Sequence, residues 1–258
     1  EDIHSEMTER MIRAAVELGI KVRGIRQLSH DGQIYLIFNY DQIPLSQIRG
    51  SVKEMIQDFK SAIMKGGLDM PSVYEVVRLT NGRPQFLPEH FARLENSLGS
   101  IGMAVPFTYE KLAESIRELA EEGNILDHNL KLEVDVSGHS ILYLSPTRYP
   151  SDEQYKTGVP AELFHGERKN PTVKMMDQTL RDATDAAIKE HKLYEVILVD
   201  RDGLITEGSR SNIFFIKDGE VYTSPLHQVL PGVTRGKIVE IIGNKGAKIH
   251  ERPIPETE

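Results

Sequence analysis

The chain contains 258 residues, with 31 lysines and arginines against 39 aspartates and glutamates, a net charge of −8, and neither cysteine nor tryptophan. Without cysteine it cannot form a disulfide framework, a zinc ribbon, a thiolate nucleophile or an iron–sulfur cluster. The acidic balance argues against a dedicated nucleic-acid-binding protein, because phosphate contacts along DNA or RNA need a basic face.

Membrane, export and metal-binding functions find no support in the sequence. No apolar stretch approaches the roughly 20 residues that a membrane-spanning helix needs. The opening residues lack the basic and apolar regions of a signal peptide, so we expect a cytoplasmic protein. The nine histidines form no metal-ligand pattern, and His165 and His227 are expected to be ordinary surface residues.

The N-terminal half carries both helix and strand patterns. Helices are expected at residues 7–18, at 46–64, from Pro88 onward and at 108–122, and strands at 21–28, 33–39, 72–79, 130–136 and 139–144. Asn81 and Gly82 form the strongest short hairpin signal available. Thr108 is expected to cap the fourth helix, and Gly123 to end it.

Residues 145–155 contain two prolines among polar residues and are the expected linker. Beyond them, helices are expected at 177–190 and 233–242, and strands at 194–199, 211–216, 221–222 and 248–251. Asp-Gly pairs at 202–203 and 218–219 predict two hairpin-like turns. The whole pattern predicts a mixed α/β or α+β fold divided near residue 150.

The densest group of residues with chemical potential lies at 204–215. Glu207 ends a short apolar run there, and Ser209, Ser211 and Asn212 follow it before a second apolar run. Taken alone, this group is typical of a polar turn between strands, in which the serines and Asn212 bind backbone groups.

A second group, residues 230–235, directly precedes the expected last helix. Gly232 followed by a helix start presents free N–H groups at the positive end of the helix dipole, which suits a phosphate. Taken alone, the same residues could form an ordinary helix entry capped by Thr234.

The order and spacing of the two groups resemble one signature, that of the class IV aminotransferases, the fold-type IV enzymes that use pyridoxal 5'-phosphate (PLP). The similarity continues upstream through the strand at 73–78, the Asn81–Gly82 turn and a His-x-x-Arg-Leu motif at His90 and Arg93. It covers roughly residues 72–252. The resemblance implies a two-domain fold, with a smaller α/β domain at 71–147 and a larger PLP-anchoring domain at 148–258.

The resemblance also implies a role for individual residues. Lys174 is in register with the family's Schiff-base lysine, and its apolar neighbours would lower its pKa by desolvation. Lys169, Lys189 and Lys192 are out of register. Arg93 corresponds to the arginine that binds the cofactor phosphate, a task that suits its fixed fork of donors.

The remaining roles concern the pyridine ring and the phosphate. Glu207 would pair with the pyridine nitrogen and keep it protonated. The backbone N–H groups of Val233 and Thr234, with the Thr234 hydroxyl, would complete the phosphate site. Ser209, Ser211 and Asn212 would shape the turn that presents Glu207 and are expected among the cofactor contacts.

Three features depart from the family pattern. Gln178 and Thr179 stand where relatives carry an aromatic or another fixed residue near the cofactor. The strand at 131–138, which supplies an arginine for substrate recognition in many relatives, has no arginine. Both ends are expected to be atypical, and residues 1–70 have no family assignment.

The resemblance implies an aminotransferase acting on an amino acid of branched-chain or D-amino acid type and a 2-oxo acid, active as a homodimer. Two alternatives remain open: an aminodeoxychorismate-type PLP lyase that releases pyruvate, and a degenerate, non-catalytic paralogue. No nucleic-acid or membrane partner is expected.

Overall fold

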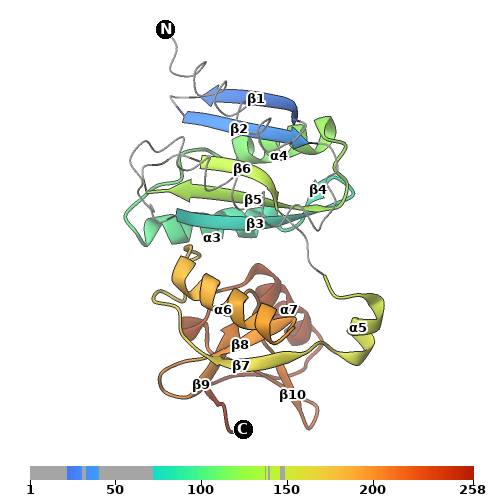
Figure 1. The fold of residues 1–258 in the computed structure, drawn as a ribbon, viewed down its shortest axis with the longest axis vertical. Coiled ribbons are helices and arrows are strands. Elements are labelled where there is room, and N and C mark those ends of the chain that lie inside the picture. The colour runs from blue at the N-terminus through green and yellow to red at the C-terminus, as the bar shows by residue number, and fades with distance from the viewer. Residues whose placement is uncertain (1–21, 31–32, 41–71, 137, 139, 146–148) are drawn as a thin grey trace. The chain divides into compact units, whose positions relative to one another are not determined.

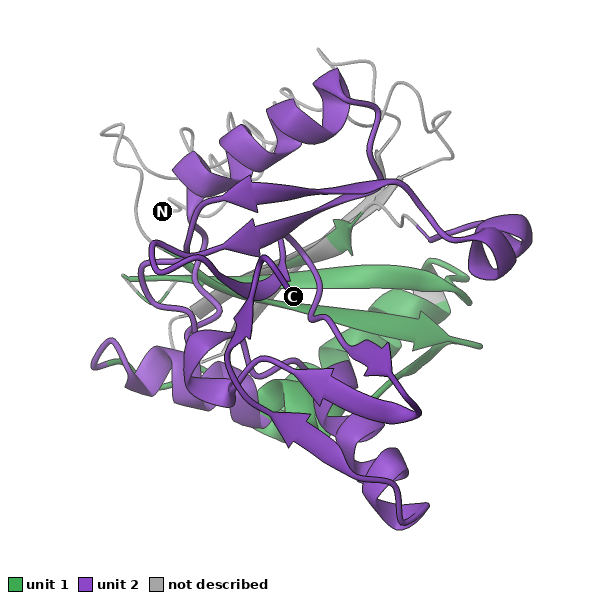
Figure 2. Cartoon of the chain, turned by 90° about the horizontal axis from the view of Figure 1, so that it is seen from below, with its two compact units in different colours: residues 1–91, 103–147 green, residues 92–102, 148–258 purple. Residues whose placement is uncertain are grey.

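The computed structural model describes residues 22–30, 33–40, 72–136, 138, 140–145 and 149–258. The chain divides into two compact units, residues 1–91 with 103–147 (unit 1) and residues 92–102 with 148–258 (unit 2) (Figure 2). The helices predicted at 7–18 and 46–64 lie outside the described residues. Among the described residues, no helix is long and apolar enough to cross a membrane, and no group of acidic residues and histidines is placed to hold a metal ion.

Unit 1 contains a four-stranded antiparallel sheet and a separate two-stranded ribbon (Figure 1). The sheet has the order β4 (Arg83–Pro84), β3 (Ser72–Thr80), β5 (His128–Asp135), β6 (Ser140–Ser145), and the ribbon pairs β1 (Val22–His30) with β2 (Gln33–Tyr40). Between β3 and β4, Asn81 and Gly82 have φ angles of 50° and 72°. Both lie in the left-handed region that a two-residue hairpin turn requires, so the predicted Asn-Gly turn is confirmed.

Two longer helices belong to the N-terminal half, α3 (Leu87–Gly99) and α4 (Tyr109–Glu122). The Thr108 side chain accepts a hydrogen bond from the backbone N–H of Lys111 at 3.3 Å, and Gly123 caps the other end of α4. The predicted caps of α4 are therefore both confirmed. Its buried leucines and isoleucine recur every three or four residues, which gives the helix one apolar face: Leu112, Ile116 and Leu119. Helix α3 runs from unit 1 into unit 2, which begins at Ala92.

Unit 2 is built on two small sheets. The first has the order β13 (Ile254–Pro255), β9 (Leu204–Gly208), β8 (Glu195–Val199), β7 (Ala161–His165), and only β7 and β8 run parallel. The second has the order β10 (Phe215–Lys217), β11 (Glu220–Thr223), β12 (Ile249–Glu251). One apolar cluster joins the two sheets: Val199, Ile205 and Ile254, with Ile197, Ile213, Phe215 and Tyr222 packed against them.

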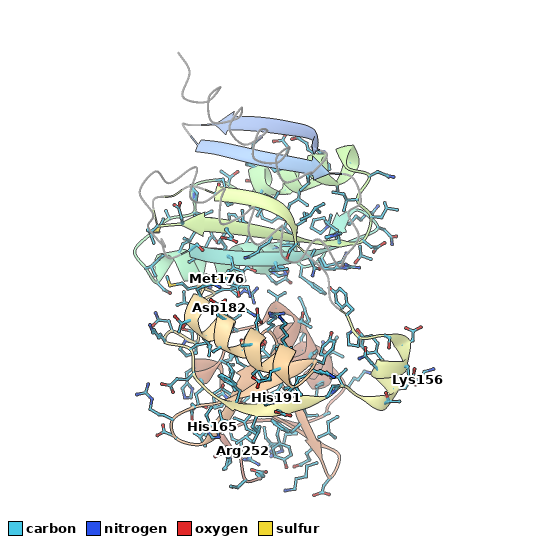
Figure 3. All side chains as sticks on the ribbon, in the orientation of Figure 1. Lys156, His165, Met176, Asp182, His191 and Arg252 are labelled. Carbon is cyan, nitrogen blue, oxygen red and sulfur yellow. The ribbon has the colours of Figure 1, made fainter. Side chains whose placement is uncertain are left out.

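Helices α6 (Gln178–Glu190) and α7 (Val233–Asn244) complete the unit, with the short α5 (Asp152–Thr157) and a single 3-10 turn, η1 (Leu226–Gln228). Asp177 caps α6 by accepting the Leu180 N–H at 3.1 Å. Ile188 near the end of α6 packs with Leu193 and Val196, which holds this helix against β8. Figure 3 labels Met176 and Asp182 near the first turn of α6 and His191 at its end.

The structure corrects three of the predicted elements. The predicted linker at 145–155 is wrong in its last residues, because α5 begins at Asp152 with a capping box formed by Ser151 and Gln154. The strand expected at 211–216 begins only at Phe215. Glu207 belongs to β9 rather than to a polar turn, and β7 and β13 were not predicted.

Candidate active site

Glu207 is the buried centre of the predicted group at 204–215. Glu207 belongs to β9 and is 3% exposed. Its Oε1 lies 2.9 Å from Arg168 Nε, and its Oε2 accepts the Leu230 N–H at 3.2 Å and Asn212 Nδ2 at 3.3 Å. Two hydrogen-bond donors and one paired cation, from separate segments, therefore surround one carboxylate.

The electrostatics of Glu207 reflect a balance between burial and cations. Burial raises the pKa of Glu207, while the charge of Arg168, the Leu230 N–H and the charge of Lys174 act in the opposite direction. The influence of Lys174 means that its amine is near enough to act on this carboxyl. A carboxylate in such surroundings is stabilised by any further cation or N–H donor that approaches it.

Lys174 lies in the segment that leads into α6, as predicted. Its side chain is half-buried beside Val173, which is 8% exposed, and its backbone N–H donates to Ser97 Oγ at 3.2 Å. Ser97 lies on the part of α3 that belongs to unit 2. Gln178 and Thr179 are exposed at the start of α6, where Gln178 Nε2 donates to Asp182 Oδ1 at 2.6 Å.

Arg93 and the start of α7 come together within unit 2. The Arg93 residue is 9% exposed, and its Nη1 donates to the carbonyl oxygen of Pro231 at 3.2 Å. Gly232 is the N-cap of α7, and no side chain caps this end. The alternative in which Thr234 caps the helix is therefore wrong, since Thr234 is exposed inside the first turn.

The N–H groups of Val233 and Thr234 are among the first four of the helix, which have no partner within it. A guanidinium beside these groups and the positive end of the helix dipole form an environment that suits a dianionic phosphate. The two predicted halves of the phosphate site, Arg93 and the start of α7, thus lie in the same part of unit 2.

Ser209 and Ser211 face a different carboxylate from Glu207. Their hydroxyls donate to Glu195, at 2.6 Å and 2.8 Å respectively. Asn212 instead bridges Glu207 Oε2 and the carbonyl of Leu230, the latter at 2.9 Å. Of the three residues predicted to shape this turn, only Asn212 contacts Glu207 directly.

Two residues near the site were not predicted, Arg168 and Glu195. Arg168 lies in a charged run, Glu167 to Lys169, whose composition is typical of surface, yet its side chain is only 11% exposed. Glu195 is the first residue of the apolar strand β8, and a single acidic residue at the start of a strand does not indicate a functional role. His165 and His227 are exposed as predicted; His165, labelled in Figure 3, lies 3.2 Å from Glu256.

Gly232 is expected to tolerate no side chain. A Cβ there would collide with Asn212 Oδ1, so Gly232→Ala must displace the amide that bridges Glu207 and Leu230. Losing these hydrogen bonds is expected to lower the free energy of unfolding by about 1–3 kcal/mol, measured by urea denaturation.

Gly236 supplies the matched control, because a Cβ at this position of α7 meets nothing within 4 Å. Gly236→Ala is expected to be neutral or to stabilise by up to about 1 kcal/mol, as alanine does in a helix. Equal stability of the two variants would contradict the close approach of Asn212 to Gly232.

The family model for class IV amino-transferases matches residues 72–258. The chain belongs to the class IV amino-transferase family. The similarity predicted from residues 72–252 is therefore confirmed, as are the mixed α/β fold and the enzyme class, a PLP-dependent transaminase.

The proteins that this chain resembles include two aminotransferases and a lyase. D-alanine aminotransferase of Bacillus licheniformis is 29% identical over 201 residues, 72% of this chain and 70% of that protein. The branched-chain amino acid aminotransferase of Escherichia coli has a similar fold, with a TM-score of 0.62 at 21% identity over 72% of this chain and 68% of that one. The 4-amino-4-deoxychorismate lyase of Pseudomonas aeruginosa also has a similar fold, with a TM-score of 0.59 at 19% identity over 72% of this chain and 74% of that one. At these identities the solved structures establish the fold alone.

Proposed function

We propose that this class IV amino-transferase moves an amino group between an amino acid, of branched-chain or D-amino acid type, and a 2-oxo acid, with PLP bound in unit 2. The observation that carries the proposal is the buried Glu207 carboxylate, which feels the charge of Lys174 and is held by Arg168 and the Leu230 N–H. Similarity to the D-alanine aminotransferase supports an amino acid as the donor.

The residues of unit 2 fit the three chemical demands of PLP. A phosphate needs a fixed cation and N–H donors, which Arg93 and the first turn of α7 supply. A protonated pyridine nitrogen needs a buried carboxylate, which is Glu207. An aldehyde needs an amine, and Lys174 lies near enough to Glu207 to influence its pKa.

PLP bound to a lysine supplies an electron sink that stabilises negative charge at the substrate Cα. Lys174 Nζ would first hold the cofactor and, once released by the substrate amine, would move a proton from the substrate Cα to the C4′ carbon of the cofactor. Glu207 would accept the pyridine N–H and favour its protonated form. Arg168 and Asn212 would keep Glu207 ionised and oriented, while burial excludes water that would screen this pair.

Reconstitution of the purified protein with PLP tests this function. We expect a visible absorption band of the lysine-bound cofactor and amino transfer that depends on 2-oxoglutarate when D-alanine or a branched-chain amino acid is the donor. Pyruvate release from aminodeoxychorismate without amino transfer would favour the lyase. Absence of the band with PLP added would overturn the proposal in favour of a non-catalytic paralogue.

Arg93→Met is expected to weaken PLP binding by about 10- to 100-fold, because hydrogen bonds between charged groups contribute roughly 1.5–3 kcal/mol each. The dissociation constant is measured by titration of the visible band. Pyridoxal without the phosphate provides the internal control, since its affinity should change by less than about threefold if Arg93 binds the phosphate.

The matched variant for Arg93 is Arg201→Met, which removes an arginine whose side chain is 79% exposed and pairs with Glu167. It should leave the affinity for PLP unchanged. A loss of affinity that is equal for PLP and pyridoxal in Arg93→Met would mean that Arg93 supports the fold and does not bind the phosphate.

We also propose that the chain acts as a homodimer, and that residues 71–147 and 148–258 form the smaller and the PLP-anchoring domain. The division of the chain between residues 147 and 148 supports this domain boundary, whereas residues 92–102 group with the second unit. Light scattering of the purified protein should give the mass of two chains, and the mass of one chain would contradict the dimer.

A further inference from the structure

The carboxylate of Glu195 collects five hydrogen bonds at the start of β8. Two come from hydroxyls, Ser209 Oγ at 2.6 Å and Ser211 Oγ at 2.8 Å. Three come from backbone N–H groups, those of Val196 at 3.0 Å, Ser209 at 3.1 Å and Arg210 at 3.4 Å. All five groups are donors, and the two oxygens of the Glu195 carboxylate accept all of them.

The segment at 208–212 is wrapped tightly around Glu195. The Gly208 N–H donates to the Ser211 carbonyl at 2.7 Å and closes the loop. A Cβ at Gly208 would collide with Ser211 Oγ and would lie 3.0 Å from Glu195 Oε2. A side chain at position 208 would therefore displace Ser211 or Glu195, so the close packing of this loop depends on the glycine.

The same loop positions the partners of Glu207. It starts at the residue after Glu207 and ends at Asn212, whose amide donates to Glu207 Oε2. Arg168, which pairs with Glu207 Oε1, also donates through Nη2 to the Ser209 carbonyl at 3.5 Å. Two of the groups that surround Glu207, the Asn212 amide and the Arg168 guanidinium, therefore contact or belong to residues 208–212.

We propose that Glu195 is a positioning residue, which holds the loop at 208–212 so that Asn212 and Arg168 orient Glu207 toward the cofactor. Its role would be exerted through this loop, because its hydrogen bonds go to Val196 and to residues 209–211. The inference rests on the proposed function, because Glu207 matters to catalysis only if it pairs with the pyridine nitrogen. It also gives Ser209 and Ser211 a purpose, as donors to Glu195.

Glu195→Gln is the sharpest test, because glutamine has the same shape but replaces one acceptor oxygen with an N–H₂ group. At least two of the five donors would then face another donor. With PLP, we expect its dissociation constant to rise about tenfold and the pH midpoint of the visible band to shift from that of the wild type. Glu162→Gln is the matched control, because Glu162 lies on β7 and pairs with the exposed His191. A PLP affinity and a pH midpoint in Glu195→Gln equal to those of this control would overturn the proposal.

If Glu195→Gln does not fold, the double variant Ser209→Ala with Ser211→Ala removes the hydroxyl donors while retaining the carboxylate. It should shift the same pH midpoint in the same direction, and an unchanged midpoint would overturn the proposal. A purely structural role would lower the unfolding temperature without moving this midpoint.

Failure of the proposed function is recognised separately, by the absence of a visible band in the wild type. In that case amide hydrogen exchange of the protein without cofactor tests the positioning role. Exchange at Ser209 and Arg210 should be at least about tenfold faster in Glu195→Gln than in Glu162→Gln. Equal exchange in the two variants would overturn the role of Glu195 in holding the loop.

Discussion

Lys174→Ala is expected to abolish the visible band of the bound cofactor and to lower the amino-transfer rate by about 10⁴-fold or more. Alanine removes both the amine that holds the cofactor and the base that moves the substrate proton, and a positioned general base alone contributes up to about 10⁴-fold. Absorption spectra and single-turnover rates measure the two losses independently.

Lys169→Ala is the control for this variant, because Lys169 is an exposed lysine of the same segment. It should retain the band and the wild-type rate. A Lys174→Ala protein that keeps the band, or that keeps a rate within tenfold of the wild type, would show that another amine holds the cofactor.

Much of unit 1 could be predicted because local patterns there agree with the tertiary structure. In α4, for example, the cap at Thr108, the apolar spacing and Gly123 all indicate the same helix, and each acts within a few residues of its partner. The Asn81–Gly82 turn is similarly local, since its two left-handed residues decide the hairpin.

Strand β9 was missed because its last residues are polar and buried. Thr206 and Glu207 are 7% and 3% exposed, but their burial is compensated by partners from other strands and loops: Leu198, Arg168 and Leu230. A hydrophobic pattern depends only on the residue types of the segment itself. Polar residues such as Thr206 and Glu207 therefore predict an exposed segment, even though their partners elsewhere in the chain allow them to be buried.

The site divides in the same way. Family similarity indicated Lys174, Arg93 and Glu207, and also Asn212, whereas the role of Arg168 is visible only in three dimensions. Glu167 and Arg168 are adjacent and both charged, yet Glu167 pairs with the exposed Arg201 while Arg168 turns inward to Glu207. Nothing in a run of charges distinguishes the two orientations.

Glu207→Gln should therefore have a large effect on the reaction and a small effect on shape. The amide fills the same volume but carries no charge, so it cannot favour the protonated pyridine nitrogen or balance Arg168. We expect kcat to fall by about 10²- to 10³-fold, the range seen when one preorganised electrostatic partner is removed. Retention of the visible band with this fall in kcat would separate a role in chemistry from a role in cofactor binding.

The pH dependence of stability tests the same carboxyl without cofactor. Burial raises the pKa of Glu207, so the folded state binds its proton more tightly than the unfolded state does. Relative to Glu207→Gln, the wild type should lose stability as pH rises from the unfolded pKa of the carboxyl to its raised folded value. Glu167 is a control in which the sign is reversed, because its hydrogen bond with Arg201 lowers the pKa of the Glu167 carboxyl. Relative to Glu167→Gln, the wild type should gain stability as the pH rises from the lowered pKa of the folded state to the pKa of the unfolded state. Urea denaturation across this range measures both slopes, and slopes of the same sign would contradict the burial of an ionisable Glu207.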